Sequence, residues 1–313
     1  MERVSEGSGV GVKGKIFIKV DKEQYAPGDL LTGSVFITIA EPIHCKELVV
    51  IVNGRESVSW DEGEPSTTIP FEKELLHHKI PLCSSSSSYE PGDYEYQFTY
   101  HLPSALPASF NVENMYHGPL ERVRVDIRYT ATAWLTAEGA SVSYLAAAQP
   151  FVVYVPAAAL APERPIDGMV SENLRFLCCF NRGTCRVKAQ VASNIHTAGE
   201  ALQLHFQVDN SASQSSTSAI NVELIEEITL MDVGNCTGMK IPTIISTQAF
   251  PGVPAGIRTE SQVVMLALAQ PSGPSGASRD VPLRATTTSQ HFTSSHFVRI
   301  TCKPFACQSI TLE

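Results

Sequence analysis

The sequence predicts an all-β protein made of two tandem antiparallel Ig-like β-sandwiches. Two observations lead to this prediction. Apolar and polar residues alternate with period two in many segments, and turns rich in Gly, Pro and Ser separate those segments. Two domains of about 150 residues each would account for the chain length of 313 residues. Hydrophobic residues make up 43% of the chain, which is enough to fill two cores.

The predicted strands follow one another through both halves of the chain. Alternation is clearest at 15–20, 122–129 and 202–208. Further strands are expected at 34–39, 47–52, 94–100, 149–155, 222–230 and 296–301. Residues 71–78 fit a short helix or a strand about equally well, so both interpretations stay open. Polar loops are expected at 61–68, 84–88 and 271–278.

A hairpin unit occurs once in each half of the chain. A strand leads into Gly28-Asp29 and then into a second strand, and the same order surrounds Gly199-Glu200. We expect each glycine to adopt a positive φ and each acid to suit the turn. The repetition predicts two similar sandwiches. The expected divisions are a flexible leader at 1–12, a first sandwich at 13–157, a Pro/Ala-rich linker at 158–171 and a second sandwich at 172–313.

Basic residues gather in two strand segments of a chain whose formal net charge is −9. With period two, the members of each group share one face of a strand. The six residues are Lys13, Lys15, Lys19, Arg122, Arg124 and Arg128. They form a candidate face for acidic or phosphorylated partners, or for anionic lipid. The alternative is a solvated face whose lysines protect an edge strand.

No catalytic, metal or cofactor site is expected. The segment Gly9–Lys15 matches G-x-G-x-x-G, but no strand precedes it and a strand rather than a helix follows it. The spacing of Cys178, Cys179 and Cys185 differs from that of common zinc sites. The nucleophile-elbow, zinc-protease and deaminase motifs are missing from the sequence. These observations predict a protein that is not an enzyme.

Charge and hydropathy predict a cytoplasmic protein that does not bind nucleic acid. The acidic balance lacks the concentrated positive field that nucleic acids require. The N-terminus has no apolar core of a signal peptide, and no apolar stretch reaches the length of a membrane span. The eight cysteines are therefore expected to be reduced thiols.

A further set of motifs follows the chain in a characteristic order. Gly92 begins a Tyr- and Phe-containing strand, which continues into Leu-Pro-x-x-Leu-Pro-x-Ser-Phe at 102–110. A Cys-Cys-Phe segment then precedes Gly183. This order resembles the arrestin family, most closely the alpha-arrestins, or arrestin-domain-containing proteins. The residues that carry the resemblance are Gly28, Asp29, Gly92, Leu102, Pro103, Leu106, Pro107, Ser109, Phe110, Cys178, Cys179, Gly183, Gly199 and Glu200.

The resemblance implies sandwiches of the arrestin N- and C-domain type and a non-catalytic adaptor. Such an adaptor would recognise membrane-protein cargo or signalling partners in endocytic trafficking and ubiquitin-dependent sorting, as a peripheral protein at the plasma membrane or endosomes. Its expected partners are the cytosolic tails of membrane proteins, which could add a strand to the edge at 15–20.

A ubiquitin ligase is a further expected partner. It would bind through a Pro-Pro-x-Tyr tail, which this sequence lacks; the chain ends inside an expected strand, so we expect a tail beyond it. Two alternatives stay open. One is a constitutive scaffold subunit of a retromer-like sorting complex, and the other is a redox-linked protein-binding module.

Overall fold

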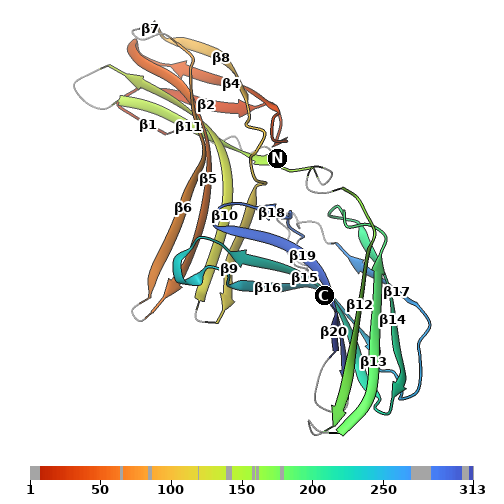
Figure 1. Ribbon diagram of the computed structural model, residues 1–313. Helices are drawn as coiled ribbons and strands as arrows, with labels where there is room; N and C mark the ends of the chain where they lie inside the picture. Colours follow the sequence, from red (N-terminus) through yellow and green to blue (C-terminus); the bar gives the residue numbers. More distant parts are fainter. Residues whose placement is uncertain are drawn as a thin grey trace. The chain divides into compact units, whose positions relative to one another are not determined.

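The computed structural model describes residues 8–63, 66–83, 87–118, 120–138, 143–156, 159, 162–176, 180–268, 283–304 and 310–312. β-Strands dominate, with one short 3-10 turn at Gly234–Cys236 (Figure 1). The predicted all-β fold class is therefore confirmed. Within the described part of the chain, no helix has the length and apolar character needed to cross a membrane.

The chain divides into two compact units, and each unit takes segments from more than one part of the sequence. Unit 1 contains Met1–Val155, Met231–Cys236 and Thr287–Phe292. Unit 2 contains Pro156–Leu230, Thr237–Thr286 and Thr293–Glu313. Two short segments from the second half of the sequence thus belong to unit 1.

Unit 1 contains a large sheet and a three-stranded sheet. The large sheet has the order β1-β11-β10-β5-β6, with β3, β7 and β9 paired beside this path, and the smaller sheet has the order β2-β4-β8. The strands are β1 (Ser8–Val10), β2 (Gly14–Val20), β3 (Gln24–Tyr25), β4 (Leu30–Ile39), β5 (Ile43–Glu62), β6 (Thr67–Pro81), β7 (Ser87–Tyr89), β8 (Gly92–His101), β9 (Phe110–His117), β10 (Leu120–Ala137) and β11 (Ser143–Val153). The longest are β5 and β10, with 20 and 18 residues.

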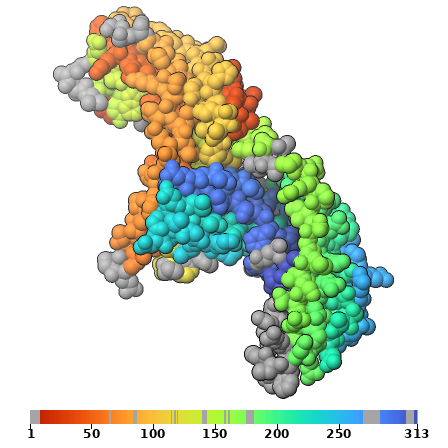
Figure 2. Space-filling model, in the orientation of Figure 1, coloured from red at the N-terminus to blue at the C-terminus, as the bar shows by residue number. Residues whose placement is uncertain are grey.

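Unit 2 also contains two antiparallel sheets. One has the order β12-β13-β14-β17, and the other has the order β16-β15-β19-β18, with β20 paired to β19. The strands of these sheets are β12 (Ile166–Phe176), β13 (Phe180–Val191), β14 (Ala201–Ser213), β15 (Thr217–Leu230), β16 (Lys240–Pro251), β17 (Gln262–Ala267), β18 (Thr287–Thr288), β19 (Phe292–Pro304) and β20 (Ile310–Leu312). Of these, β18 and Phe292 of β19 lie in the segment that belongs to unit 1. In the space-filling view, green atoms of β12 and β13 and cyan to blue atoms of β15, β16 and β19 are visible on this unit (Figure 2).

The apolar members of the alternating strands form the cores, as predicted. In β10, Val123, Val125 and Ile127 are buried, while Arg124 and Asp126 between them are half-buried. In unit 2, Leu204, Phe206 and Val208 of β14 belong to the buried cluster. Burial of one face on each strand is the main favourable term in the folding of such sheets.

The first repeated turn has the predicted backbone conformation. Gly28 has a φ of +87°, a conformation that residues with a Cβ rarely adopt. The Asp29 carboxylate accepts a hydrogen bond from the backbone N–H of Ala26 at 2.8 Å, which closes the turn. The Gly28 N–H donates to the carbonyl of Pro103 at 3.2 Å, so the turn is also tied to the Leu-Pro segment.

The second turn reproduces these contacts. Gly199 has a φ of +94°. The Glu200 carboxylate accepts a hydrogen bond from the backbone N–H of Thr197 at 2.9 Å. The Gly199 N–H donates to the carbonyl of Leu268 at 2.6 Å. The prediction of a repeated hairpin unit is confirmed, because the strands on either side pair as antiparallel neighbours in both units.

The Leu-Pro-x-x-Leu-Pro-x-Ser-Phe segment is anchored to unit 1 by apolar and polar contacts. The Ser109 backbone N–H donates to the Val153 carbonyl at 2.7 Å, and the Ser109 hydroxyl accepts from the Val153 N–H at 2.9 Å. The Tyr129 hydroxyl donates to the Pro107 carbonyl at 2.8 Å. The buried side chains of this segment are Leu102, Leu106, Ala108 and Phe110.

The structure corrects several expectations about element bounds. Residues 71–78, which fitted a helix or a strand about equally well, are strand within β6. Asp61 and Thr68, expected in a loop, lie in β5 and β6 and pair across the hairpin. Strand β12 begins at Ile166, inside the expected linker, because it pairs along β13. Cys178 and Cys179 lie outside the described residues.

Candidate protein-docking face of unit 1

A polar groove of about 860 Å³ lies on the exposed face of the large sheet of unit 1, over β5, β6, β9 and β10. The alternation of the long strands builds it, because every second residue of β5 and β10 points away from the core. In the β5–β10 ladder, Arg124 lies opposite Ser59, and Asp126 lies opposite Ser57. We call this surface the docking groove.

The docking groove carries both signs of charge. Its basic side chains are Arg55, Lys73, Arg124 and Arg128. Its acidic side chains are Glu72, Glu74, Glu113 and Asp126. The groove can therefore meet a partner with alternating donors and acceptors, and it is not a uniformly positive surface.

Several of these charges are paired within the groove. Arg128 lies 3.2 Å from the carboxylate of Asp126, and Arg55 forms an ion pair with Glu72. The Asn111 side-chain amide donates a hydrogen bond to the same Asp126 carboxylate at 3.0 Å. Since such pairs on a surface are worth little in stability, a charged partner can replace them at small cost.

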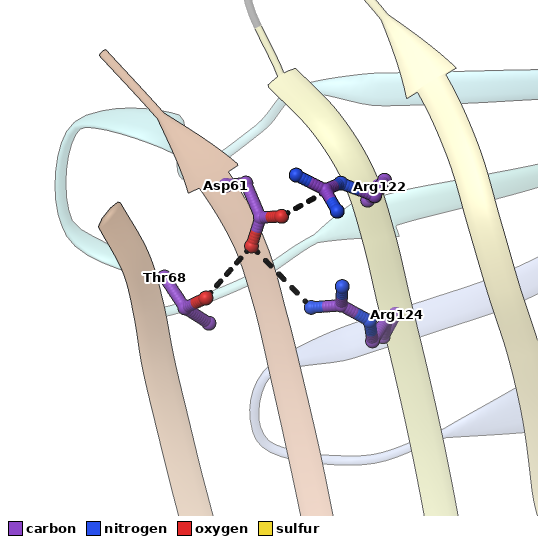
Figure 3. A network of polar contacts seen from close by, with 4 residues as sticks. All are labelled: Asp61, Thr68, Arg122 and Arg124. Carbon is purple, nitrogen blue, oxygen red and sulfur yellow. Dashed lines mark hydrogen bonds and ion pairs between the residues drawn. The ribbon is translucent and has the colours of Figure 1, made fainter. Parts of the chain in front are cut away.

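Asp61 organises one end of the groove by binding two arginines (Figure 3). One carboxylate oxygen lies 2.8 Å from Nε of Arg122, and the other lies 3.4 Å from Nη1 of Arg124. The Thr68 hydroxyl donates to the second oxygen at 2.8 Å. Only 5% of the Asp61 side chain is exposed, so the carboxylate is largely withdrawn from solvent.

The backbone of β10 bends at the point where it supplies these arginines. Arg122 has a φ of +48°, in the left-handed region that non-glycine residues seldom adopt. The ladder shifts register between Glu121 and Arg124, as it does at a β-bulge. The bulge lies where Arg122 and Arg124 reach the same carboxylate. Period-two geometry places the two arginines on one face but does not predict this shared partner.

The surroundings of Asp61 keep it ionised. The Thr68 hydrogen bond is the largest cause that lowers the pKa of the Asp61 carboxyl below its ordinary value. Arg122 and Arg124 lower it further, and burial acts in the opposite direction. The result is a fixed negative charge that holds two guanidinium groups.

The predicted lysines lie on a different sheet from the arginines. Lys15 and Lys19 are exposed on β2 of the three-stranded sheet, and Lys13 precedes it and pairs with Glu41 at 2.6 Å. The structure therefore does not bring the six basic residues onto one sheet. Strand β2 pairs only with β4 among the described strands, so the prediction of an edge strand at 15–20 is confirmed.

Glu56 is a buried acid that the sequence analysis missed. It lies on the core side of β5, between Gly54 and Val58, and is 0% exposed. Its carboxylate accepts hydrogen bonds from the Ser289 hydroxyl at 2.6 Å and from the His291 backbone N–H at 2.8 Å, all within unit 1. The signal that could have identified Glu56 is an acidic residue at a position of the alternation where an apolar residue is expected.

Burial limits the chemistry available to three of the five described cysteines. Burial is the main cause that raises the pKa of Cys45 and Cys302 to about 12 and that of Cys185 to about 11. These thiols are protonated at neutral pH and hence poor nucleophiles. No group of three or more potential ligands that could hold a metal ion occurs among the described residues.

Comparisons with known proteins agree with this architecture. Residues 14–145 match the family model "Arrestin (or S-antigen), N-terminal domain". Arrestin domain-containing protein A of Dictyostelium discoideum is 27% identical over 113 residues, which cover 31% of this chain and 19% of that protein. Arrestin domain-containing protein 17 of Caenorhabditis elegans is 22% identical over 222 residues, which cover 66% of this chain and 50% of that protein.

The matched regions thus span half or less of each of these two relatives. The family match covers most of unit 1, and the longer alignment covers two thirds of the chain. The same turn contacts recur in unit 2. Residues 14–145 match the arrestin N-terminal domain, and these comparisons support an alpha-arrestin-like family for the chain.

Proposed function

We propose that this protein is a non-catalytic adaptor that binds the cytosolic tails of membrane proteins during endocytic trafficking and ubiquitin-dependent sorting. Arrestin-family proteins are generally non-catalytic, which supports a role in binding. The observation that carries the proposal is the docking groove, an open polar surface over β5, β6, β9 and β10. On this proposal the protein works at the cytoplasmic face of the plasma membrane or of endosomes.

The charges of the groove indicate the kind of peptide that fits. Arg124, Asp126 and Arg128 are alternate residues of β10, so their side chains lie on the same face of the strand and Asp126 lies between the two arginines. An extended peptide repeats its side chains with the same period. A tail segment with two acidic residues four positions apart and a polar residue midway between them would therefore meet the two arginines and avoid Asp126.

The test is a binding screen with the 313-residue chain on an array of peptides from cytosolic tails. For peptides that bind, affinity is measured by fluorescence anisotropy at several salt concentrations. We expect the double variant Arg124→Glu and Arg128→Glu to weaken binding at least ten-fold, and added salt to weaken binding to the unmodified protein. A matched control, Arg186→Glu and Lys188→Glu on exposed positions of β13, is expected to bind normally.

Two results would contradict the proposal. One is that the array retains no tail peptide above background. The other is that the groove variant binds every retained peptide as tightly as the β13 control does. Recovery of the protein from cells in a salt-resistant, stoichiometric complex would instead favour the constitutive scaffold.

A further inference from the structure

An apolar pocket of about 260 Å³ lies between the two sheets of unit 2. Its inner wall consists of buried side chains from β14, β15 and β19, namely Leu202, Leu204, Leu224 and Ile300. Ile166 of β12 also lines the pocket and is 50% exposed, so the pocket reaches the protein surface there. A pocket with this lining favours hydrocarbon over water.

One polar atom inside the pocket lacks a partner. His296 of β19 lines the pocket, and its Nε2 atom is buried without a hydrogen bond to any described residue. The other ring nitrogen, Nδ1, lies 3.3 Å from the Thr286 hydroxyl. If that hydroxyl donates to Nδ1, the Nε2 atom carries the ring proton and can donate to a ligand. A buried donor without an acceptor is unfavourable, and an acceptor on a ligand would satisfy it.

The electrostatic surroundings keep the imidazole neutral. Burial and then the charge of Arg284 lower the pKa of His296 to about 4. Arg284 is ion-paired with the buried carboxylate of Glu226, so the Nε2 atom of the neutral ring is the group that the pocket offers to a ligand acceptor. None of the described residues that line the pocket is acidic, so nothing in the lining repels a carboxylate.

We propose that this pocket binds a small, mainly hydrocarbon molecule with one hydrogen-bond acceptor, of which a medium-chain fatty acid is the simplest example. An apolar cavity of about 150 Å³ suffices for benzene. The larger pocket in unit 2 therefore suits about ten non-hydrogen atoms. The hydrocarbon part would lie against the leucines, and the acceptor would meet Nε2 of His296.

The test compares two probes of equal size, octanoate and n-butylbenzene, by titration of the whole chain. Octanoate has the acceptor and n-butylbenzene does not. The substitution His296→Phe keeps a ring of similar shape and removes Nε2. We expect it to weaken octanoate binding about ten-fold and to change n-butylbenzene binding less than two-fold.

A second substitution tests the apolar part of the pocket. Ala189 of β13 lines the pocket, and Ala189→Leu should fill it and weaken both probes at least ten-fold. Ala201→Leu is the matched control, because Ala201 is exposed on β14 and does not line the pocket. It should leave both affinities unchanged.

A measurement on the unmodified protein tests the same contact without depending on whether a variant folds. Octanoate should shift the ¹⁵N resonance of His296 Nε2, and n-butylbenzene should leave it nearly unchanged. The proposal is overturned if neither probe binds, if His296→Phe leaves octanoate binding intact, or if it weakens the two probes equally.

Discussion

Replacing Glu56 by alanine tests whether this buried carboxylate holds the segment Thr287–Phe292 within unit 1. The carboxylate receives short hydrogen bonds from the Ser289 hydroxyl and the His291 N–H, and a longer one of 3.3 Å from the Gln290 N–H. Loss of a buried acceptor costs about 1–3 kcal/mol for each donor that it strands. Taking about 1.5 kcal/mol for each of the two short bonds, we expect the segment to lose about 3 kcal/mol of stability.

The assay is amide hydrogen exchange at Gln290 and His291, because exchange reports local opening in a protein with more than one unit. A loss of about 3 kcal/mol corresponds to about 100-fold faster exchange at these two amides. Glu56→Gln keeps one side-chain oxygen as an acceptor, so its exchange should rise by only about ten-fold.

The control variant is Glu72→Ala on the neighbouring strand β6. Glu72 pairs with Arg55 at the surface, where ion pairs contribute about 0–1 kcal/mol, so the exchange of Gln290 and His291 should hardly change. Unchanged protection of both amides in Glu56→Ala would refute the reasoning. It would mean that apolar contacts such as Phe110 with Phe292, whose ring centroids are 4.9 Å apart, hold the segment alone.

Three further predictions concern the turn, the pocket histidine and the thiols. Gly28→Ala should lower stability by about 1 kcal/mol, as measured by urea unfolding, because the φ of Gly28 is +87°. Gly28→Asn should lower it by less. Equal stability of the unmodified protein and both variants would contradict the backbone argument. The pKa of His296 is lowered from 6.5 to about 4, so the unfolded chain binds the proton more tightly, and stability should fall by about 3 kcal/mol as the pH drops through this range. Burial raises the pKa of Glu226, so protonation of Glu226 stabilises the folded protein as the pH drops and opposes the effect of His296. The test therefore compares the unmodified protein with His296→Phe in thermal unfolding at pH 7 and at pH 4. Iodoacetamide at pH 8 should modify the buried thiols at least ten-fold more slowly in the native protein than in urea, and equal rates would show that they are accessible. The thiols concerned are Cys45, Cys185 and Cys302.

The sequence by itself determined the fold class and the repeated turn, because both depend on local patterns. Period-two alternation requires one buried face whichever strand lies alongside, so the buried residues of β10 were predictable. The turns at Gly28 and Gly199 were predictable because a positive φ selects glycine, and the acid that follows closes the turn within three residues.

The tertiary structure alone decided the functional contacts, because they join residues far apart in the sequence. Asp61 and Thr68 lie in a segment that reads as a loop, and only the pairing with β10 brings Arg122 and Arg124 to the carboxylate. Alternation predicts that Arg122 and Arg124 share a strand face, but it does not predict the register shift between Glu121 and Arg124.

Glu56 shows the same limit over a longer distance. Its position marks it as a buried acid, but the donors that satisfy it are 233 to 235 residues further along the chain. Local patterns state which side of a strand a residue faces. Which distant groups complete its hydrogen bonds depends on how the whole chain closes around it, and that is a property of the folded molecule.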